Sequence, residues 1–185
     1  MAVGGFFKPS WRRASDGDLA RASARKDAKA FAELIRRYQD PVFRFARQYL
    51  GDAQGAEDVC QEAFLRLFQS LENRPDIAVR PYVFSIARNL CCDQVRKKRP
   101  ENWERPPEMV DGKTPLELLN KRQGLDALSR AVDQLPESQK TVILLRHTRE
   151  LSYAQIAQAM ETTVPAVESL LIRARKKIKT MLQPS

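Results

Sequence analysis

The side chains best suited to chemistry are concentrated near the carboxyl end, where five cations lie between Arg173 and Lys179. Guanidinium and ammonium groups neutralise phosphates, while Glu168 and Ser169, one to two turns earlier, have side chains that can reach base edges. This order along one helix is typical of a helix that enters a DNA major groove. We therefore expect residues 151–181 to read duplex DNA.

The same residues have the pattern of a helix-turn-helix. Ser152 is predicted to cap a short first helix, and Thr163 a second one, near whose start Pro165 needs no N–H. Glu161 stands at the turn, where glycine is usual. The inward stripe of the second helix is predicted to be Val167, Leu171, Ala174 and Ile178. A helical hairpin with a solvated basic face is the structural alternative.

A second basic stretch, residues 80–99, combines aromatic and cationic side chains. Tyr82 and Phe84 lie near its start, and its end is strongly polar. Aromatic rings beside cations can hold an unstacked base while neutralising phosphates. Alternatively, the rings belong to the core and the cations complement the helix dipole. Periodicity does not separate these two interpretations.

Residues 52–71 form the clearest amphipathic pattern in the chain. One face is apolar, and the opposite face carries acidic and amide side chains, including Glu57, Asp58, Gln61 and Glu62. Such a face is either simply solvated or docks a basic partner helix.

The remaining elements predict an all-α protein of two small helical domains. Helical spacing recurs in several further segments, while the alternation typical of strands is hard to find. Prolines and charged residues over 100–115 indicate a flexible linker between domains at 15–99 and 116–185, and residues 1–14 are predicted to be a flexible basic leader. The further helices are expected over 15–39, with an interruption near Lys26 and Asp27, from Pro41 to 50, over 116–135, and from Pro136 onward.

Composition narrows the possible functions. Lys and Arg number 32 against 23 Asp and Glu, a formal charge of +9 that favours a polyanionic partner. There is no apolar run of about 18 residues and no secretory signal, so we expect a cytoplasmic protein without membrane insertion. Cys60, Cys91 and Cys92 indicate neither disulfides nor zinc, and His147 is isolated, so we expect no metal, cofactor or catalytic residue.

Four stretches together resemble the conserved regions of small sigma-70 family factors of the extracytoplasmic-function (ECF) group. Their order and spacing cover residues 15 to about 182. In sequence they read DLARASARKDAKAFAELIRRYQDPVFRFARQYL, GAEDVCQEAFLRLF, PYVFSIARNLCCDQVRKKR and LPESQKTVILLRHTRELSYAQIAQAMETTVPAVESLLIRARKKI.

The resemblance implies a transcription initiation factor that binds core RNA polymerase and promoter DNA, both double- and single-stranded. It implies contact with the clamp helices of the largest subunit and the flap of the second, and an anti-sigma factor as a further partner. Contact with the clamp helices falls on Glu57, Asp58, Gln61, Glu62 and Phe64. Reading of the minus-10 element falls on Tyr82, Arg88, Asn89, Asp93, Arg96, Lys97 and Arg99. Reading of the minus-35 element falls on Arg146, Ala166, Glu168, Ser169, Ile172, Arg173, Arg175 and Lys176.

This chain departs from the family pattern at a few positions. Many members have Trp where Tyr82 stands, a cation at Glu168 and another at Leu170, and Gly-Thr-Val where this chain has Pro-Ala-Val at 165–167. The promoter sequence that it reads therefore stays open. The alternatives are a stand-alone helix-turn-helix regulator, with residues 15–99 for sensing or dimerisation, and, more distantly, a helical RNA-binding or nuclease-like enzyme.

Overall fold

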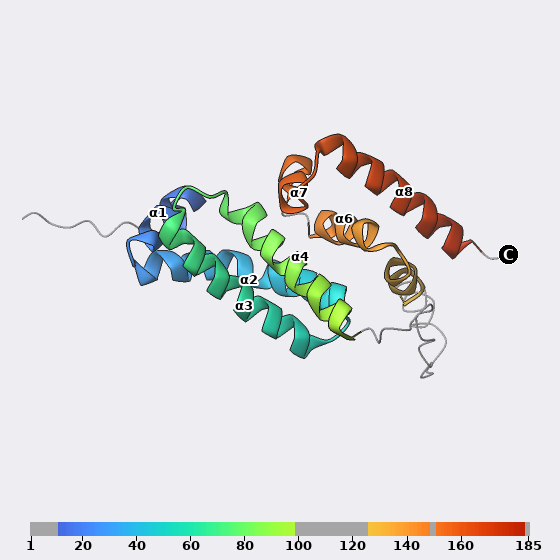
Figure 1. The fold of residues 1–185 in the computed structure, drawn as a ribbon, viewed down its shortest axis with the longest axis horizontal. Helices are drawn as coiled ribbons and strands as arrows, with labels where there is room; N and C mark the ends of the chain where they lie inside the picture. Colours follow the sequence, from blue (N-terminus) through green and yellow to red (C-terminus); the bar gives the residue numbers. More distant parts are fainter. Residues whose placement is uncertain (1–10, 99–125, 149–150, 184–185) are drawn as a thin grey trace, which may run out of the picture.

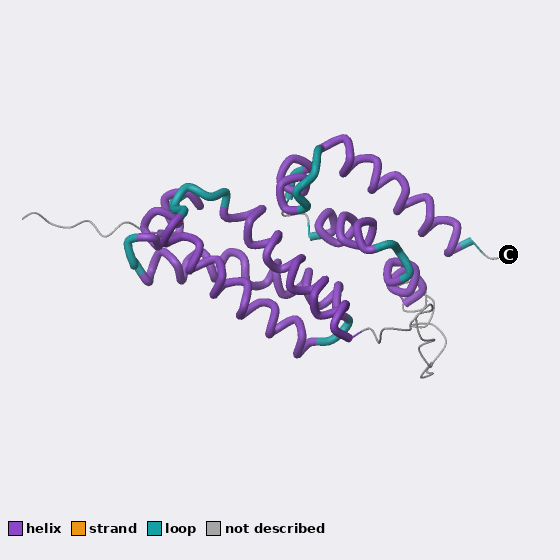
Figure 2. Tube along the Cα trace, viewed as in Figure 1, coloured by secondary structure: helices purple, strands orange, loops and turns teal. Residues whose placement is uncertain are grey.

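A computed structural model describes residues 11–98, 126–148 and 151–183. Within these ranges the chain consists of helices joined by short loops, and no strand occurs (Figure 2). The prediction of an all-α fold is therefore confirmed. The linker expected at residues 100–115 lies outside the described residues.

The first half of the chain folds as a bundle of long helices (Figure 1). Two N-caps explain where its first long helices begin: the Ser15 side chain accepts from the Asp18 amide at 3.1 Å, and Asp27 accepts from the Lys29 amide at 2.9 Å. The expected interruption near Lys26 is present, because this residue has a φ of 65°. The elements are η1 (Trp11–Arg13), α1 (Asp16–Ala24), α2 (Ala28–Leu50), α3 (Ala53–Asn73) and α4 (Val79–Lys98).

One expected helix boundary is wrong, because Pro41 lies inside α2 rather than at the start of a new helix. Proline in a helix interior removes a hydrogen bond and crowds the preceding turn, at a cost of about 3 kcal/mol. Val42 and Phe45, just after it, are fully buried, and α2 packs against both α3 and α4. The burial of one continuous apolar face outweighs the local penalty.

The leader is also shorter than expected. Residues 11–13 form η1, and the Arg37 guanidinium donates to the carbonyl oxygens of Trp11 and Arg12 at 3.1 and 3.2 Å. Arg37 is held in turn by Asp16 at 2.9 Å. The segment expected to be flexible up to residue 14 is therefore fixed from Trp11 onward, and residues 1–10 lie outside the described part.

Glu33 is the only buried carboxylate among the described residues, and its surroundings predict that the stability of the fold decreases in acid. Its oxygens accept from Arg36 at 2.7 Å and Arg37 at 2.9 Å, and these hydrogen bonds lower its pKa from 4.5 to about 2. A carboxylate whose pKa is lower in the folded state stabilises the protein above its unfolded pKa, and this contribution is lost as the pH falls through the folded pKa.

We expect Glu33→Gln to be destabilised relative to wild type at pH 5, and the difference to shrink toward pH 2. Urea unfolding followed by circular dichroism at both pH values measures it. Glu72→Gln is the control, because Glu72 is exposed and pairs with Lys26 at the surface. A difference between Glu33→Gln and wild type that is the same at both pH values would contradict the prediction.

The second half contains residues 126–133 as a helix, then α6 (Glu137–His147), α7 (Tyr153–Ala159) and α8 (Val164–Leu182). Ser152 and Gln155 form a capping box at α7, and the Thr163 hydroxyl accepts from the Ala166 amide at 3.4 Å. Both expected caps are confirmed. The inward stripe of α8 is buried at Val167, Leu171 and Ala174, while Ile178 is half-buried.

The turn between α7 and α8 places Glu161 in the left-handed region, with a φ of 53°. A side chain in this conformation costs about 1–2 kcal/mol, a penalty that glycine escapes. We expect Glu161→Gly to raise the melting temperature by roughly 2–4 °C for each kcal/mol of strain relieved, a gain offset in part by the greater entropy of unfolded glycine. Glu161→Gln keeps the strain and removes the charge, so a gain of the same size in that variant would assign the effect to charge instead.

The two halves pack against each other, with α4 against α7 and α2 against α6 (Figure 1). Lys140 of α6 lies 5.0 Å from the centre of the Tyr49 ring on α2, and the Tyr49 hydroxyl lies 3.2 Å from the sulfur of Cys92 on α4. Cys60 is buried as the core residue that was expected, and burial raises its pKa to about 11. One buried apolar cluster therefore runs through both halves.

Candidate functional site

The polar face of α3 is acidic and open to solvent. Glu57, Asp58 and Gln61 are exposed, whereas half-buried Glu62 pairs with Arg66 at 2.6 Å. Phe64 differs from the other four predicted contact residues, because it lies in the core with 6% of its surface exposed. It can support a docking surface but presents little of itself to a partner.

Leu65 is the residue of this surface that the sequence interpretation missed. Its side chain is 52% exposed, and it shares one shallow groove with Asp58, Gln61 and Glu62, and a second with Phe31 and Phe68. The rings of Phe31 and Phe68 meet edge to face at 4.9 Å. Leu65 follows the buried Ala63 and Phe64 and falls outside the apolar stripe of the helix. An apolar residue outside that stripe was the signal from which its exposure could have been predicted. An exposed apolar side chain beside acidic ones suits a basic amphipathic helix.

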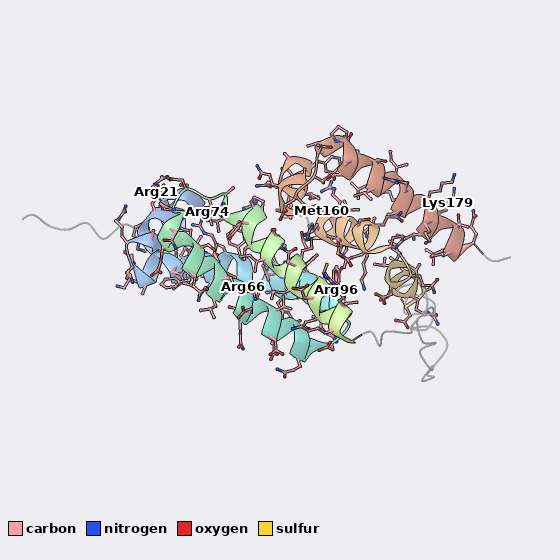
Figure 3. All side chains as sticks on the ribbon, in the orientation of Figure 1. Arg21, Arg66, Arg74, Arg96, Met160 and Lys179 are labelled. Atoms are coloured by element: carbon pink, nitrogen blue, oxygen red, sulfur yellow. The ribbon has the colours of Figure 1, made fainter. Side chains whose placement is uncertain are left out.

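The predicted minus-10 residues lie along α4. Tyr82, Asn89, Asp93 and Arg96 are spaced by seven, four and three residues, which places them on one face of the helix. Figure 3 shows Arg96 near the carboxyl end of α4. Asn89, Asp93, Arg96 and Lys97 are exposed, and Arg88 is half-buried. Arg99 lies outside the described residues.

Tyr82 and Phe84 differ in how deeply they are buried. Phe84 is fully buried, so for this ring the core interpretation is correct. Tyr82 is half-buried: Arg74 lies 5.4 Å from its ring centre and its hydroxyl lies 2.9 Å from that of Ser70. Its ring lines a shallow cleft at the contact between α4 and α7, opposite Gln158 and Glu161.

The outward face of α8 carries nearly all the predicted minus-35 residues. Arg146, in the last turn of α6, stacks on the Tyr153 ring at 5.4 Å and shares a shallow pocket with Arg175 of α8. Lys179 lies near the end of α8 (Figure 3), so the positive charge extends along this helix. On α8 the exposed predicted residues are Glu168, Ser169, Ile172, Arg173, Arg175 and Lys176, and Ala166 is half-buried.

Metal-binding clusters and membrane-spanning helices were not found in the part of the chain that the structure describes. No group of three or more His, Cys, Asp or Glu side chains is arranged to hold a metal ion there. His147 is exposed at the end of α6, whereas Cys60, Cys91 and Cys92 are buried. Among the described helices, none is long and apolar enough to cross a membrane.

An all-α chain with a capped helix-turn-helix, a cationic second helix in that motif and a separate exposed acidic face has the features of a DNA-binding protein. Two family models match it: Sigma-70 region 2 over residues 34–101, and Sigma-70, region 4 over residues 125–178. The first spans most of the helical bundle with α3 and α4, and the second spans the helix-turn-helix.

Characterised relatives cover nearly the whole chain. The RNA polymerase sigma-H factor of Pseudomonas aeruginosa is 31% identical over 182 residues, which cover 91% of this chain and 94% of the relative. The ECF RNA polymerase sigma-E factor of Escherichia coli K12 is 30% identical over 183 residues, covering 92% and 95% of the two chains. The chain belongs to the sigma-70 family, in its ECF group, and it is a transcription initiation factor that directs RNA polymerase to promoters.

Solved structures support the fold. CnrH in complex with the cytosolic domain of CnrY matches with a TM-score of 0.71 and 24% identity, over 90% of this chain and 96% of that chain. The sigma factor RpoE in complex with the anti-sigma factor NepR from Bartonella quintana matches with a TM-score of 0.63 and 20% identity, over 84% and 98%. The similarity extends over both halves of the chain.

Proposed function

We propose that the acidic face of α3 docks core RNA polymerase, that α4 captures the minus-10 element, and that α8 reads the minus-35 element. Residues 15–99 and 116–185 then act as two domains, and the chain makes and breaks no covalent bond itself. The polymerase contact uses Glu57, Asp58, Gln61 and Glu62, together with the exposed Leu65 one turn further along α3. The acidic side chains attract a basic helix from solution, and the neighbouring apolar side chain provides area that holds it.

The observation that carries this proposal is the division of surface chemistry among three helices. The face of α3 is acidic with an exposed leucine, α4 combines a half-exposed tyrosine with cations, and α8 carries five cations against one carboxylate. Protein docking, single-strand capture and duplex reading require these three different surfaces. Linking two weak DNA readers raises their effective concentration at one promoter.

We infer that the protein acts in the cytoplasm, with the polymerase and promoter DNA, and that an anti-sigma factor restrains it. Both structural neighbours described above are complexes: CnrH with the cytosolic domain of CnrY in one, and the sigma factor RpoE with the anti-sigma factor NepR in the other. An inhibitor that covers the acidic face of α3 or the cationic face of α8 would block one of the proposed contacts.

Run-off transcription tests the proposal. Purified core polymerase, this protein and a genomic fragment library are combined, and the transcripts are sequenced, alongside duplex binding by the protein alone. We expect discrete start sites only when protein and core are both present. Tight binding to a palindromic duplex without core, and no transcripts, would instead support a stand-alone regulator that acts as a symmetric dimer.

A further inference from the structure

Two exposed residues of α8, Glu168 and Ile172, are not explained by the stability of the helix. Glu168 is the only acidic residue of α8, in a helix that carries five cations. It is the fifth residue of the helix, beyond the first turn in which a carboxylate complements the dipole. The residues three and four positions later are Leu171 and Ile172, so no ion pair along the helix is available at those spacings.

Ile172 is unusual for its exposure. With 66% of its surface accessible, it is the most exposed of the large hydrophobic side chains in the described ranges. Its neighbour in sequence is Arg173, and Arg175 follows two residues after that, so Ile172 stands among cations that favour phosphate. An apolar side chain on such a face has a matching partner in the major groove, the C5-methyl group of thymine.

The spacing of the two residues fits the base-pair repeat. Residues four apart lie on the same face of a helix, and their axial separation is about 6 Å. Base pairs are about 3.4 Å apart along DNA, so the two side chains would reach positions about two base pairs apart when the helix follows the groove. Arg175 and Lys179 continue the same stripe toward the sugar-phosphate backbone of the DNA.

We propose that Glu168 and Ile172 set the minus-35 specificity of this sigma factor. Glu168 accepts a hydrogen bond from the N4 amino group of a cytosine, which is a donor in the major groove that a carboxylate can recognise. Ile172 packs on the methyl group of a thymine about two base pairs away. This inference rests on the proposed function, because α8 must lie in the minus-35 major groove for either contact to form.

The test uses holoenzyme formed from the full chain and core polymerase, on a promoter library randomised at the minus-35 element. Transcript sequencing should show that wild type selects a C·G pair and, about two base pairs away, a T·A pair. Glu168→Gln should lose the preference for cytosine by about tenfold, and Ile172→Ala should lose the preference for thymine by about fivefold. Each variant should keep the other preference. Lys179→Ala is the matched control and should weaken all sequences alike.

A change in the DNA alone tests the methyl contact independently. Replacing the selected thymine by deoxyuridine removes only the methyl group, so it should weaken wild-type binding and leave Ile172→Ala unaffected, as a double-mutant cycle requires. Base profiles of Glu168→Gln and Ile172→Ala that match wild type would overturn the inference. If wild-type holoenzyme gives no promoter-specific transcripts from any template, the proposed function itself fails, which is a distinct outcome.

Discussion

Reversing the charge of the acidic face on α3 should weaken binding to core RNA polymerase by at least about 100-fold. The double variant Asp58→Lys with Glu62→Lys places two cations where the proposed basic partner helix docks, and like charges across an interface cost several kcal/mol. Asp58 is exposed and Glu62 is half-buried, with Arg66 as its only ion-pair partner in the described residues, so the fold should survive. Fluorescence anisotropy with labelled protein and purified core measures the affinity.

The matched control reverses two charges at the carboxyl end of α3 and in the loop that follows it. Glu72→Lys with Asp76→Lys changes the net charge by the same amount, roughly 20 Å away along α3 and the loop that follows it. Both carboxylates are exposed and make only surface ion pairs, Glu72 with Lys26 at 3.1 Å and Asp76 with Arg21 at 3.2 Å. Equal losses of affinity in the two double variants would show a general electrostatic effect and not a docking face.

Removing the ring of Tyr82 should reduce capture of single-stranded minus-10 DNA by about tenfold or more. Stacking of a base on an aromatic side chain contributes about 1–3 kcal/mol, and Tyr82 is the half-exposed ring at the start of α4. Binding of wild-type, Tyr82→Ala and Tyr82→Phe holoenzymes to a template with an open minus-10 strand measures the effect. Affinity for a duplex minus-35 fragment should be unchanged in all three.

Tyr82→Phe separates the ring from its hydroxyl group. The hydroxyl lies 2.9 Å from that of Ser70, an interaction between α4 and α3 that contributes to stability and not to stacking. The Phe variant should therefore bind single-stranded DNA like wild type, with a small loss of thermal stability. If it binds as weakly as the Ala variant, Tyr82 acts through its hydroxyl, and the stacking role is wrong.

The sequence predicted the local elements of the helix-turn-helix well because their determinants are close together in the chain. The hydroxyl groups of Ser152 and Thr163 cap their helices by accepting from backbone amides only three residues away. The buried residues Val167 and Leu171 are one helical turn apart. Glu161 stands at the turn where glycine is usual, and in the structure it adopts the left-handed conformation that glycine tolerates best. Such signals depend on residues that are close in sequence, so they can be recognised without knowledge of the tertiary packing.

The candidate surfaces were predicted only in part, because exposure depends on contacts between distant residues. Phe64 and Leu65 are adjacent and both apolar, yet the first is buried and the second lies open beside the acidic face. Likewise Phe84 belongs to the core while Tyr82 remains half-exposed in a cleft that α7 helps to form. Spacing alone left these pairs unresolved.

By itself, the sequence determined an all-α chain, its main helices, its basic recognition helix and, through four motifs in order, its family. Only the tertiary structure decided that α2 continues through Pro41, that Arg37 fixes η1, and that α4 packs against α7. Helix formation and capping are governed by groups three or four residues apart, so they can be read along the chain. Burial and the contacts between halves are set by residues tens of positions apart, as the contact of Tyr49 with Lys140 illustrates.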